Sequence, residues 1–236
     1  MPYLRGHWQL ALIALAVLVL WSTPVLYPVR ILIVFLHELS HGLAALITGG
    51  SIESLTLTPD EGGLTLTRGG NRFLILSAGY LGSLLFGVAL FLAALRTRLD
   101  RAVVAALGLC SLVIAALYIR DGFPLIFCLL TGVALLLIAR FTSHGGNDLA
   151  LRVVGLSSMF YVPEDIVSDT ISRSHLPSDA RMLAEEFGAA TVIWGGAWFL
   201  ISLAVIALTL RLGLGASSNL ALRSAGPGES PIPPRS

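Results

Sequence analysis

The sequence predicts an all-α polytopic membrane protein with six or seven transmembrane helices and a small β-hairpin after the second of them. The prediction rests on composition, on long apolar stretches and on one period-2 segment. Of the 236 residues, 56% are hydrophobic and only 12% are charged, whereas soluble domains carry about 25% charged residues. So little polar surface cannot cover a water-soluble particle, and lipid must therefore solvate much of the chain.

Seven apolar stretches are candidates for transmembrane helices, because a spanning helix needs about 20 mainly apolar residues. In lipid the backbone polar groups must be satisfied within each segment, which favours helices. The number is six or seven because the sixth stretch contains two charged residues, Asp165 and Asp169, which disfavour a position in lipid. The seven stretches are residues 8–27, 28–48, 73–95, 102–119, 123–141, 148–169 and 190–212.

Polar segments divide the rest of the chain. Residues 51–68 alternate Leu and Thr on both sides of a Pro-Asp-Glu-Gly-Gly turn, which is the period-2 pattern of a β-hairpin. A Pro-Ser-Asp start and a short amphipathic run predict an interfacial helix at about 178–187. Residues 214–236 are rich in Ser, Pro and Gly, which is typical of disorder. We expect one transmembrane domain over residues 1–213 and a disordered tail over 214–236.

One predicted helix carries the pattern His37-Glu38-Leu39-Ser40-His41. At about 100° per residue, His37 and His41 point the same way, one turn apart, and both can bind one Zn²⁺ ion. Glu38 lies beside the metal, where its carboxylate can take a proton from the bound water. A structural alternative is a set of polar side chains that satisfy one another, but ionisable groups in a span usually indicate function. The pattern therefore predicts a hydrolytic zinc site with Glu38 as general base.

The third zinc ligand must come from elsewhere, because a catalytic zinc takes three protein ligands and leaves a fourth position for water. Asp165 and Asp169 are four residues apart, so both face one side of a helix. We favour Asp165 as the ligand, with Asp169 as an alternative ligand or as a partner that orients a histidine. Asp169 has a further alternative as a helix cap or a solvated helix end. Glu164 points elsewhere and is expected to be solvated.

These residues resemble the site-2 protease (M50) family of intramembrane zinc metalloproteases, and more closely its compact M50B-like branch. The resemblance covers roughly residues 30–205 and implies peptide hydrolysis by one zinc ion in or at the edge of the membrane. It also implies Asp165 as the ligand, whereas better-known members use Leu-Asp-Gly or Asn-Pro-Asp-Gly motifs that this chain lacks. The matching residues are Phe35-Leu36-His37-Glu38-Leu39-Ser40-His41-Gly42, Glu61-Gly62-Gly63, Arg68-Gly69-Gly70, Ser77-Ala78-Gly79-Tyr80-Leu81-Gly82-Ser83 and Asp165-Ile166-x-x-Asp169.

The predicted function is an intramembrane zinc metalloendopeptidase in a bacterial plasma membrane, acting on membrane proteins with single-span helices. Because a helical substrate shields its carbonyls, it must unwind locally, and the 51–68 hairpin could pair with the extended segment by β-addition. A plain solvated hairpin is the alternative. The net charge of +1 argues against a nucleic-acid partner, which needs a concentrated basic face.

Two other classes of function compete with hydrolysis. A catalytically silent relative could bind helices or assist assembly, but an intact Glu38 argues against it, because loss of that carboxylate is the simplest way to abolish hydrolysis. A metal or solute transporter usually carries its site on broken helices in paired repeats. The sequence contains no visible pair of such repeats.

Overall fold

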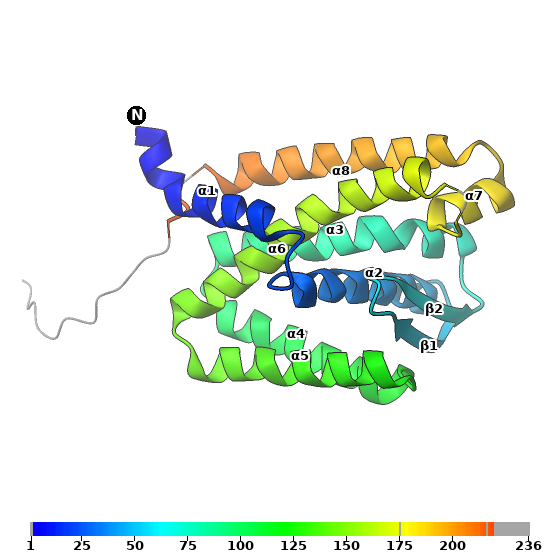
Figure 1. Cartoon of the computed structure of the whole chain (residues 1–236), viewed down its shortest axis with the longest axis horizontal. Helices are drawn as coiled ribbons and strands as arrows, with labels where there is room; N and C mark the ends of the chain where they lie inside the picture. The colour runs from blue at the N-terminus through cyan, green and yellow to red at the C-terminus, as the bar shows by residue number, and fades with distance from the viewer. Residues whose placement is uncertain (1, 175, 216, 220–236) are drawn as a thin grey trace, which may run out of the picture.

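The computed structural model describes residues 2–174, 176–215 and 217–219. Within these residues, eight α-helices run mostly along the long axis of the molecule, and a two-stranded antiparallel hairpin lies at one end (Figure 1). The predicted all-α polytopic fold, with its hairpin after the helix that carries the histidine motif, is confirmed. The elements are α1 (Pro2–Leu20), α2 (Tyr27–Ile47), β1 (Ser51–Leu57), β2 (Gly63–Arg68), α3 (Arg72–Arg96), α4 (Asp100–Tyr118), α5 (Gly122–Phe141), α6 (His144–Val167), the π-helical turn η1 (Ser168–Ser172), α7 (Asp179–Phe187) and α8 (Thr191–Gly213).

Five helices in the described residues are long and apolar enough to cross a membrane, namely α2, α3, α4, α5 and α8. They make the chain a multi-pass membrane protein. The prediction of six or seven spans included two further stretches, which correspond to α1 and α6. Within α1 the stretch Arg5–Leu20 is apolar but shorter than the five spans, and α6 contains several charged residues, among them Asp148, Arg152 and Asp165. Neither helix therefore adds to the five.

Helix α2 lies inside the bundle, between α3, α6 and the hairpin (Figure 1). Of its apolar stretch, 67% is buried within the protein, compared with 17% for α8 at the edge of the bundle. The residues from Ile31 to Leu36 are all buried, and a helix that is hydrophobic on every side is typical of such a central position. The helix that carries the histidine motif is thus shielded by its neighbours.

Small residues allow α3 and α6 to cross closely. A Cβ atom added to Gly87 would lie 2.4 Å from the Cβ of Ser158, and one added to Gly155 would lie 2.8 Å from the Cβ of Phe91. The hydroxyl of Ser158 also donates a 2.8 Å hydrogen bond to the carbonyl of Ser83. Close backbone approach through small residues is typical of helix packing in membranes, and here it fixes α3 against α6 beside the site.

The hairpin has the predicted extent, and its tip is tied to α2. Leu55 pairs with Thr65 in the antiparallel register, and the side chain of Leu55 is buried against the bundle. Glu61 in the turn adopts a left-handed conformation with φ 63°, and its carboxylate lies 2.7 Å from the guanidinium of Arg30. Tyr27 donates a 2.8 Å hydrogen bond to the carbonyl of Pro59. The hairpin is therefore packed on the protein rather than free in solvent.

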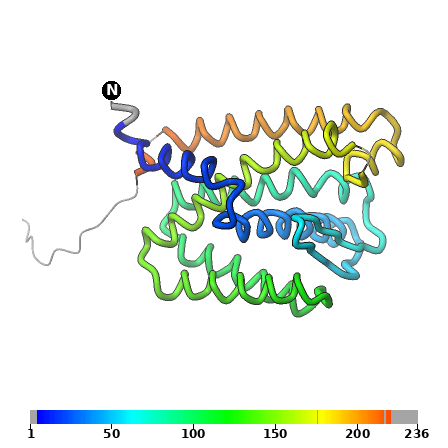
Figure 2. The backbone as a smooth tube through the Cα atoms, viewed as in Figure 1, coloured from blue at the N-terminus to red at the C-terminus, as the bar shows by residue number. Residues whose placement is uncertain are grey.

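A short helix, α7, begins within one residue of the predicted position. The side chain of Ser178 accepts a 3.3 Å hydrogen bond from the backbone N–H of Arg181, which is the usual contact of a helix N-cap. Most of the predicted disordered tail, 214–236, lies outside the described residues. Of that tail, the N–H of Ser218 donates a 2.9 Å bond to the carbonyl of Gly6. The segment at Ser218 thus lies against α1 at the end of the bundle away from the hairpin (Figure 2).

Candidate metal centre

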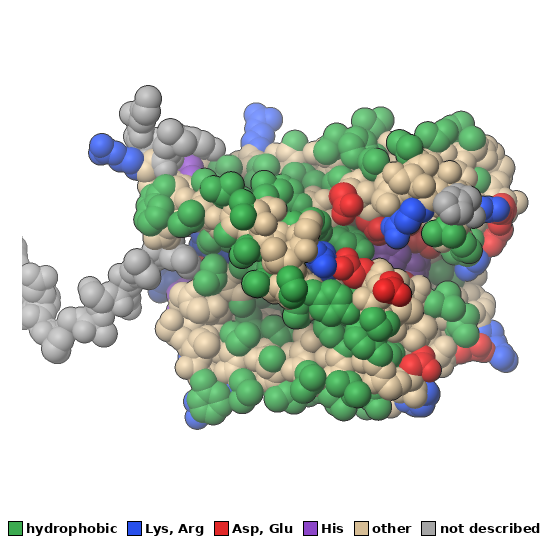
Figure 3. All heavy atoms as spheres, in the orientation of Figure 1, with side chains coloured by type: hydrophobic (Ala, Val, Ile, Leu, Met, Phe, Trp, Pro, Cys, Tyr) green, Lys and Arg blue, Asp and Glu red, His purple; other side chains and the backbone are tan. Residues whose placement is uncertain are grey.

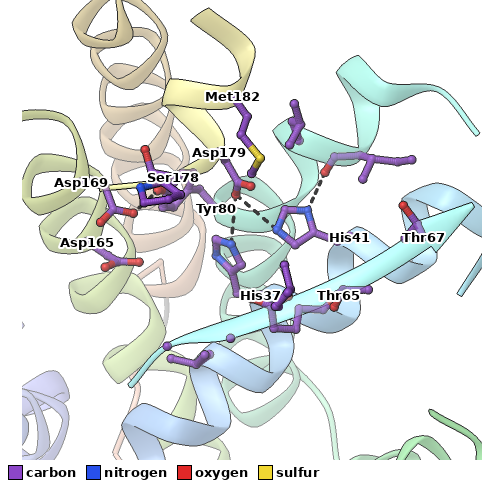
Figure 4. Close-up of a pocket in the computed structure, with 18 of the residues that line it drawn as sticks. His37, His41, Thr65, Thr67, Tyr80, Asp165, Asp169, Ser178, Asp179 and Met182 are labelled. Atoms are coloured by element: carbon purple, nitrogen blue, oxygen red, sulfur yellow. Dashed lines mark hydrogen bonds and ion pairs between the residues drawn. The ribbon is translucent and has the colours of Figure 1, made fainter. Parts of the chain in front are cut away.

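Three side chains that could hold a metal ion converge where α2 passes α7 (Figure 4). The Nε2 atoms of His37 and His41 lie 3.1 and 3.3 Å from Oδ2 of Asp179. The two imidazole rings have centroids 4.8 Å apart, as expected for residues one helical turn apart on the same face. Among the described residues, these three form the group whose ligand atoms all lie within 4.8 Å of one another.

The His41 ring is held in the tautomer that a metal requires. Its Nδ1 atom lies 2.7 Å from the carbonyl oxygen of Ile75 on α3. A carbonyl can only accept, so Nδ1 carries the proton and donates it to this bond. The lone pair is then on Nε2, which faces Asp179 and His37, and such a bond on the far nitrogen is typical of metal-binding histidines.

Asp179 stands in the first turn of α7 with its side chain 7% exposed. Burial alone raises the pKa of this carboxyl, but the two imidazoles, which carry positive charge when they are protonated in the absence of a metal, outweigh burial and hold the pKa well below its usual value. Neither imidazole contact is aligned as a hydrogen bond, so the buried Oδ2 atom has no hydrogen-bond donor among the described residues. A cation between the three groups would satisfy it.

The backbone of α3 closes the space behind the ligand atoms of His37, His41 and Asp179. A Cβ atom added to Gly79 would lie 2.4 Å from Nε2 of His37 and 2.5 Å from Oδ2 of Asp179. Any larger residue would therefore intrude on the point where the three ligand atoms converge. Two imidazole nitrogens and one carboxylate oxygen form a donor set that zinc accepts in catalytic sites, where it keeps a fourth position open. The residues present fit a bound zinc ion.

Glu38 lies on the hairpin side of the same site. Its side chain is buried, and a Cβ atom added to Gly63 on β2 would lie 2.5 Å from its Cγ and 2.6 Å from its Oε1. The hydroxyl of Thr65 donates a 2.9 Å hydrogen bond to the Glu38 carbonyl and so ties β2 to α2. The strand therefore determines where the Glu38 carboxylate can lie.

A cavity of about 430 Å³ opens over the three ligand atoms. One wall is β2 from Gly63 to Thr67, and the opposite wall comes from α6, η1 and α7. In the space-filling view, histidine side chains are visible in a hollow between acidic and basic side chains (Figure 3). The cavity is large enough for an extended peptide segment to lie between β2 and the ligand atoms.

Asp165 and Asp169, the ligands expected from the sequence, line this cavity but lie outside the group of three donors. Nη2 of Arg173 lies 3.0 Å from Oδ1 of Asp165 and 2.8 Å from Oδ1 of Asp169. The phenol of Tyr80 donates a hydrogen bond to the other oxygen of Asp169. These carboxylates are therefore balanced by Arg173 rather than by the histidines. Glu164 is exposed, as expected.

From the sequence alone Asp179 has no predicted metal role. Its position after Ser178 is typical of the start of a helix, which explains the residue without any metal. The carboxylate reaches the histidines because the turn η1 and the following segment bring α7 back against α3, which packs on α2. Asp179 can therefore be recognised as a candidate third ligand for the two histidines only once this tertiary contact is known.

Comparisons with known proteins give one match. The sequence model of the family described as Peptidase M50B-like matches residues 10–209, a stretch that contains the histidine motif and Asp179. Curated proteins and solved structures provide no match to the chain.

Proposed function

The chain belongs to the Peptidase M50B-like family, and from that premise we propose that it is an intramembrane zinc metalloendopeptidase. The observation that carries the proposal is the convergence of His37, His41 and Asp179 beside Glu38 at the floor of one cavity. The motif helix is shielded inside a bundle that contains five candidate spans among its described residues. That environment supports cleavage within the membrane or at its edge.

We infer that the third ligand is Asp179, in place of Asp165. The Asp179 carboxylate lies at 3.1 and 3.3 Å from the two imidazole nitrogens, whereas Asp165 is paired with Arg173. A zinc ion held by these three side chains would polarise the scissile carbonyl and lower the pKa of water at the open position to about 7.

Glu38 acts as the general base in this proposal. It follows His37 directly in α2, so its carboxylate lies next to the ligand atoms without belonging to the donor group. The tight contact with Gly63 restricts the position of that carboxylate. From there it takes a proton from the attacking water and returns the proton to the leaving amine, a role worth about 10²–10⁴-fold in rate.

The strand β2 binds the substrate backbone in this proposal. Its neighbour β1 occupies one edge, and residues 63–67 of β2 line the cavity that contains the ligand atoms. A membrane-embedded substrate that unwinds near the site can add to the free edge as a further strand, with its carbonyl directed towards the metal. Single-span helices are the expected substrates. Such a helix has to unwind over only one short segment, and the cavity has to accept only that segment.

The test measures zinc and cleavage together in the purified full-length chain in detergent. Wild type, Glu38→Gln and Glu164→Gln are analysed for metal content and assayed on a panel of single-span substrates. We expect one zinc per chain in all three proteins and cleavage in all except Glu38→Gln. Glu164→Gln is the matched control, because Glu164 is an exposed glutamate on α6.

Two results would contradict the proposal in different ways. A wild type without stoichiometric zinc would exclude the metalloprotease function. Zinc without any cleavage that depends on Glu38 would instead favour the catalytically silent relative, which binds helices or assists assembly.

A further inference from the structure

Asp169 contacts two elements of the metal centre without belonging to it. Its Oδ2 atom accepts a hydrogen bond from the phenol of Tyr80 on α3, and its Oδ1 atom lies 2.8 Å from Nη2 of Arg173. The side chain is about one-fifth exposed, at 19%. Asp165, one turn earlier, contacts only the Arg173 side of this arrangement, at 3.0 Å. The two aspartates are therefore not equivalent.

The Tyr80 contact leads to His37. The Tyr80 ring packs edge-on against the His37 imidazole, with centroids 5.0 Å apart and an interplanar angle of 85°. The ring of His41 is fixed by its hydrogen bond to Ile75, but in the described residues His37 has no comparable bond to a backbone carbonyl. The His37 ring therefore packs against a Tyr80 ring whose hydroxyl is held by Asp169 and whose other contacts include Trp198.

The Arg173 contact leads to Asp179. The backbone N–H of Arg173 donates a 2.7 Å hydrogen bond to the carbonyl of Ser168, and its own carbonyl accepts a 2.8 Å bond from Leu176. This segment ends at Ser178, which caps α7 and is followed directly by Asp179. Anchoring the Arg173 side chain thus fixes the beginning of the connection whose end presents the third ligand.

The turn that carries Asp169 is itself held firmly. Thr170 is buried, and its hydroxyl donates a 2.6 Å hydrogen bond to the carbonyl of Ile166. A Cβ atom added to Gly195 on α8 would lie 2.0 Å from Cγ2 of Thr170, so η1 and α8 are in close contact. Asp169 therefore projects from a fixed point and can brace two neighbouring elements.

We propose that Asp169 is a positioning residue that holds His37 and Asp179 in metal-binding geometry, through Tyr80 on one side and Arg173 on the other. It binds no metal itself. This inference rests on the proposed function in one respect, namely that the site binds zinc. Hydrogen-bonded partners outside the ligand set typically contribute about 10–100-fold to metal affinity, and Asp169 acts on two of the three ligands.

The test uses zinc and cobalt alone as probes, with the full-length chain in detergent. Zinc affinity is measured by competition with a chromophoric chelator, and the visible spectrum of the Co²⁺-loaded protein reports ligand geometry. We expect Asp169→Asn to bind zinc about 10–100-fold more weakly than wild type, with unchanged stoichiometry at saturation and shifted cobalt bands. Asp165→Asn should lose less affinity, and the exposed control Glu164→Gln should behave as wild type.

The variant Tyr80→Phe removes only one O–H group and separates positioning from general stability. If Asp169 acts through Tyr80, the two substitutions should not be additive in their effect on zinc affinity. Adding Tyr80→Phe to Asp169→Asn should then lower zinc affinity by less than Tyr80→Phe lowers it in the wild type. Should Asp169→Asn fail to fold, Tyr80→Phe still tests the inference, because wild-type zinc affinity and cobalt bands in that variant would overturn it.

Two further outcomes for Asp169→Asn would overturn the inference. Wild-type affinity and spectrum would show that the Arg173 cluster only stabilises the fold. Complete loss of stoichiometric zinc, as expected for a ligand, would make Asp169 a ligand itself. Each of these results requires a wild type that binds zinc, whereas a wild type without zinc would instead refute the proposed function.

Discussion

Two clusters of buried charged groups, one at each end of the helical bundle, are satisfied in different ways. At the end where Ser218 contacts α1, Arg152 and Asp148 of α6 are 3% and 6% exposed. The guanidinium of Arg152 donates a 2.9 Å bond to Asp148 and another bond to the carbonyl of Ser218. Near the hairpin, two histidines and Asp179 converge, and a buried carboxylate oxygen has no aligned donor among the described residues.

This difference distinguishes a charge cluster that stabilises the fold from a group of side chains that could bind a metal ion. A buried ion pair with good geometry is complete in itself, and removal of one partner leaves an uncompensated charge. A set of converging side chains that could bind a metal is complete only when a cation is present, and in the proposed function the adjoining cavity would give that cation access to substrate. Substitutions at the hairpin end should therefore change chemistry, and substitutions at the other end should change stability.

The largest expected effect follows from removing Asp179, the proposed third ligand. Asp179→Ala should lose stoichiometric zinc and all measurable hydrolysis, because two histidines alone do not complete a catalytic zinc site. Asp165→Ala should keep one zinc per chain, because that carboxylate pairs with Arg173. Metal analysis and the cleavage assay on both variants test the difference.

The opposite pattern would move the ligand to α6. Zinc lost in Asp165→Ala and retained in Asp179→Ala would mean that the arrangement of α7 changes when metal binds. The cluster of Asp165 and Arg173 would then take part in metal binding rather than only balance its own charges.

Local patterns in the sequence predict the features that depend only on residues close together in the sequence. His37 and His41 share a face because of helical periodicity alone, and residues 51–68 form a hairpin because their side chains alternate about a turn. Both features occur in the structure where they were predicted. They locate the histidine motif and one wall of the cavity.

The remaining features depend on contacts that sequence spacing does not reveal. Asp165 was favoured because it lies in an apolar stretch four residues before Asp169, yet Arg173 in the following polar segment balances both charges. Asp179 fits the pattern of an ordinary helix start. Length and apolar content single out five candidate spans among the described residues and leave out α1 and α6, although both belong to the bundle.

A smaller effect is expected where the hairpin meets the general base. In Gly63→Ala the new Cβ would lie 2.5 Å from Cγ of Glu38, so the carboxylate or the strand must move. A displacement of about 1 Å can lower the rate about 100-fold, and we expect that loss in kcat with zinc content unchanged. Steady-state kinetics and metal analysis of the purified variant measure both quantities.

The matched control for this substitution is Gly196→Ala. Gly196 also lies in the membrane domain, but a Cβ atom added there meets nothing within 4 Å, so hydrolysis should equal that of wild type. If Gly63→Ala lost zinc together with activity, the hairpin would shape the metal centre itself rather than the position of Glu38.

The smallest expected effect on hydrolysis comes from the opposite end of the bundle, in Arg152→Met. This change leaves the Asp148 carboxylate buried without its partner and should destabilise the fold by about 3–5 kcal/mol. The protein that remains folded should still bind one zinc and cleave at the wild-type rate. Thermal unfolding in detergent measures the first effect, and activity per folded molecule measures the second.

The double variant Asp148→Leu/Arg152→Met shows whether the pair has any role besides balancing its own charges. Replacing a buried ion pair by apolar residues of similar size is often neutral or stabilising, so most of the stability lost in Arg152→Met should return. Because α6 carries this pair and continues into the turn with Asp169, a loss of zinc affinity that persists in the stable double variant would mean that the two ends are coupled through α6. Unchanged zinc affinity would instead establish that the same helix carries one charge cluster for stability and another that serves the metal centre.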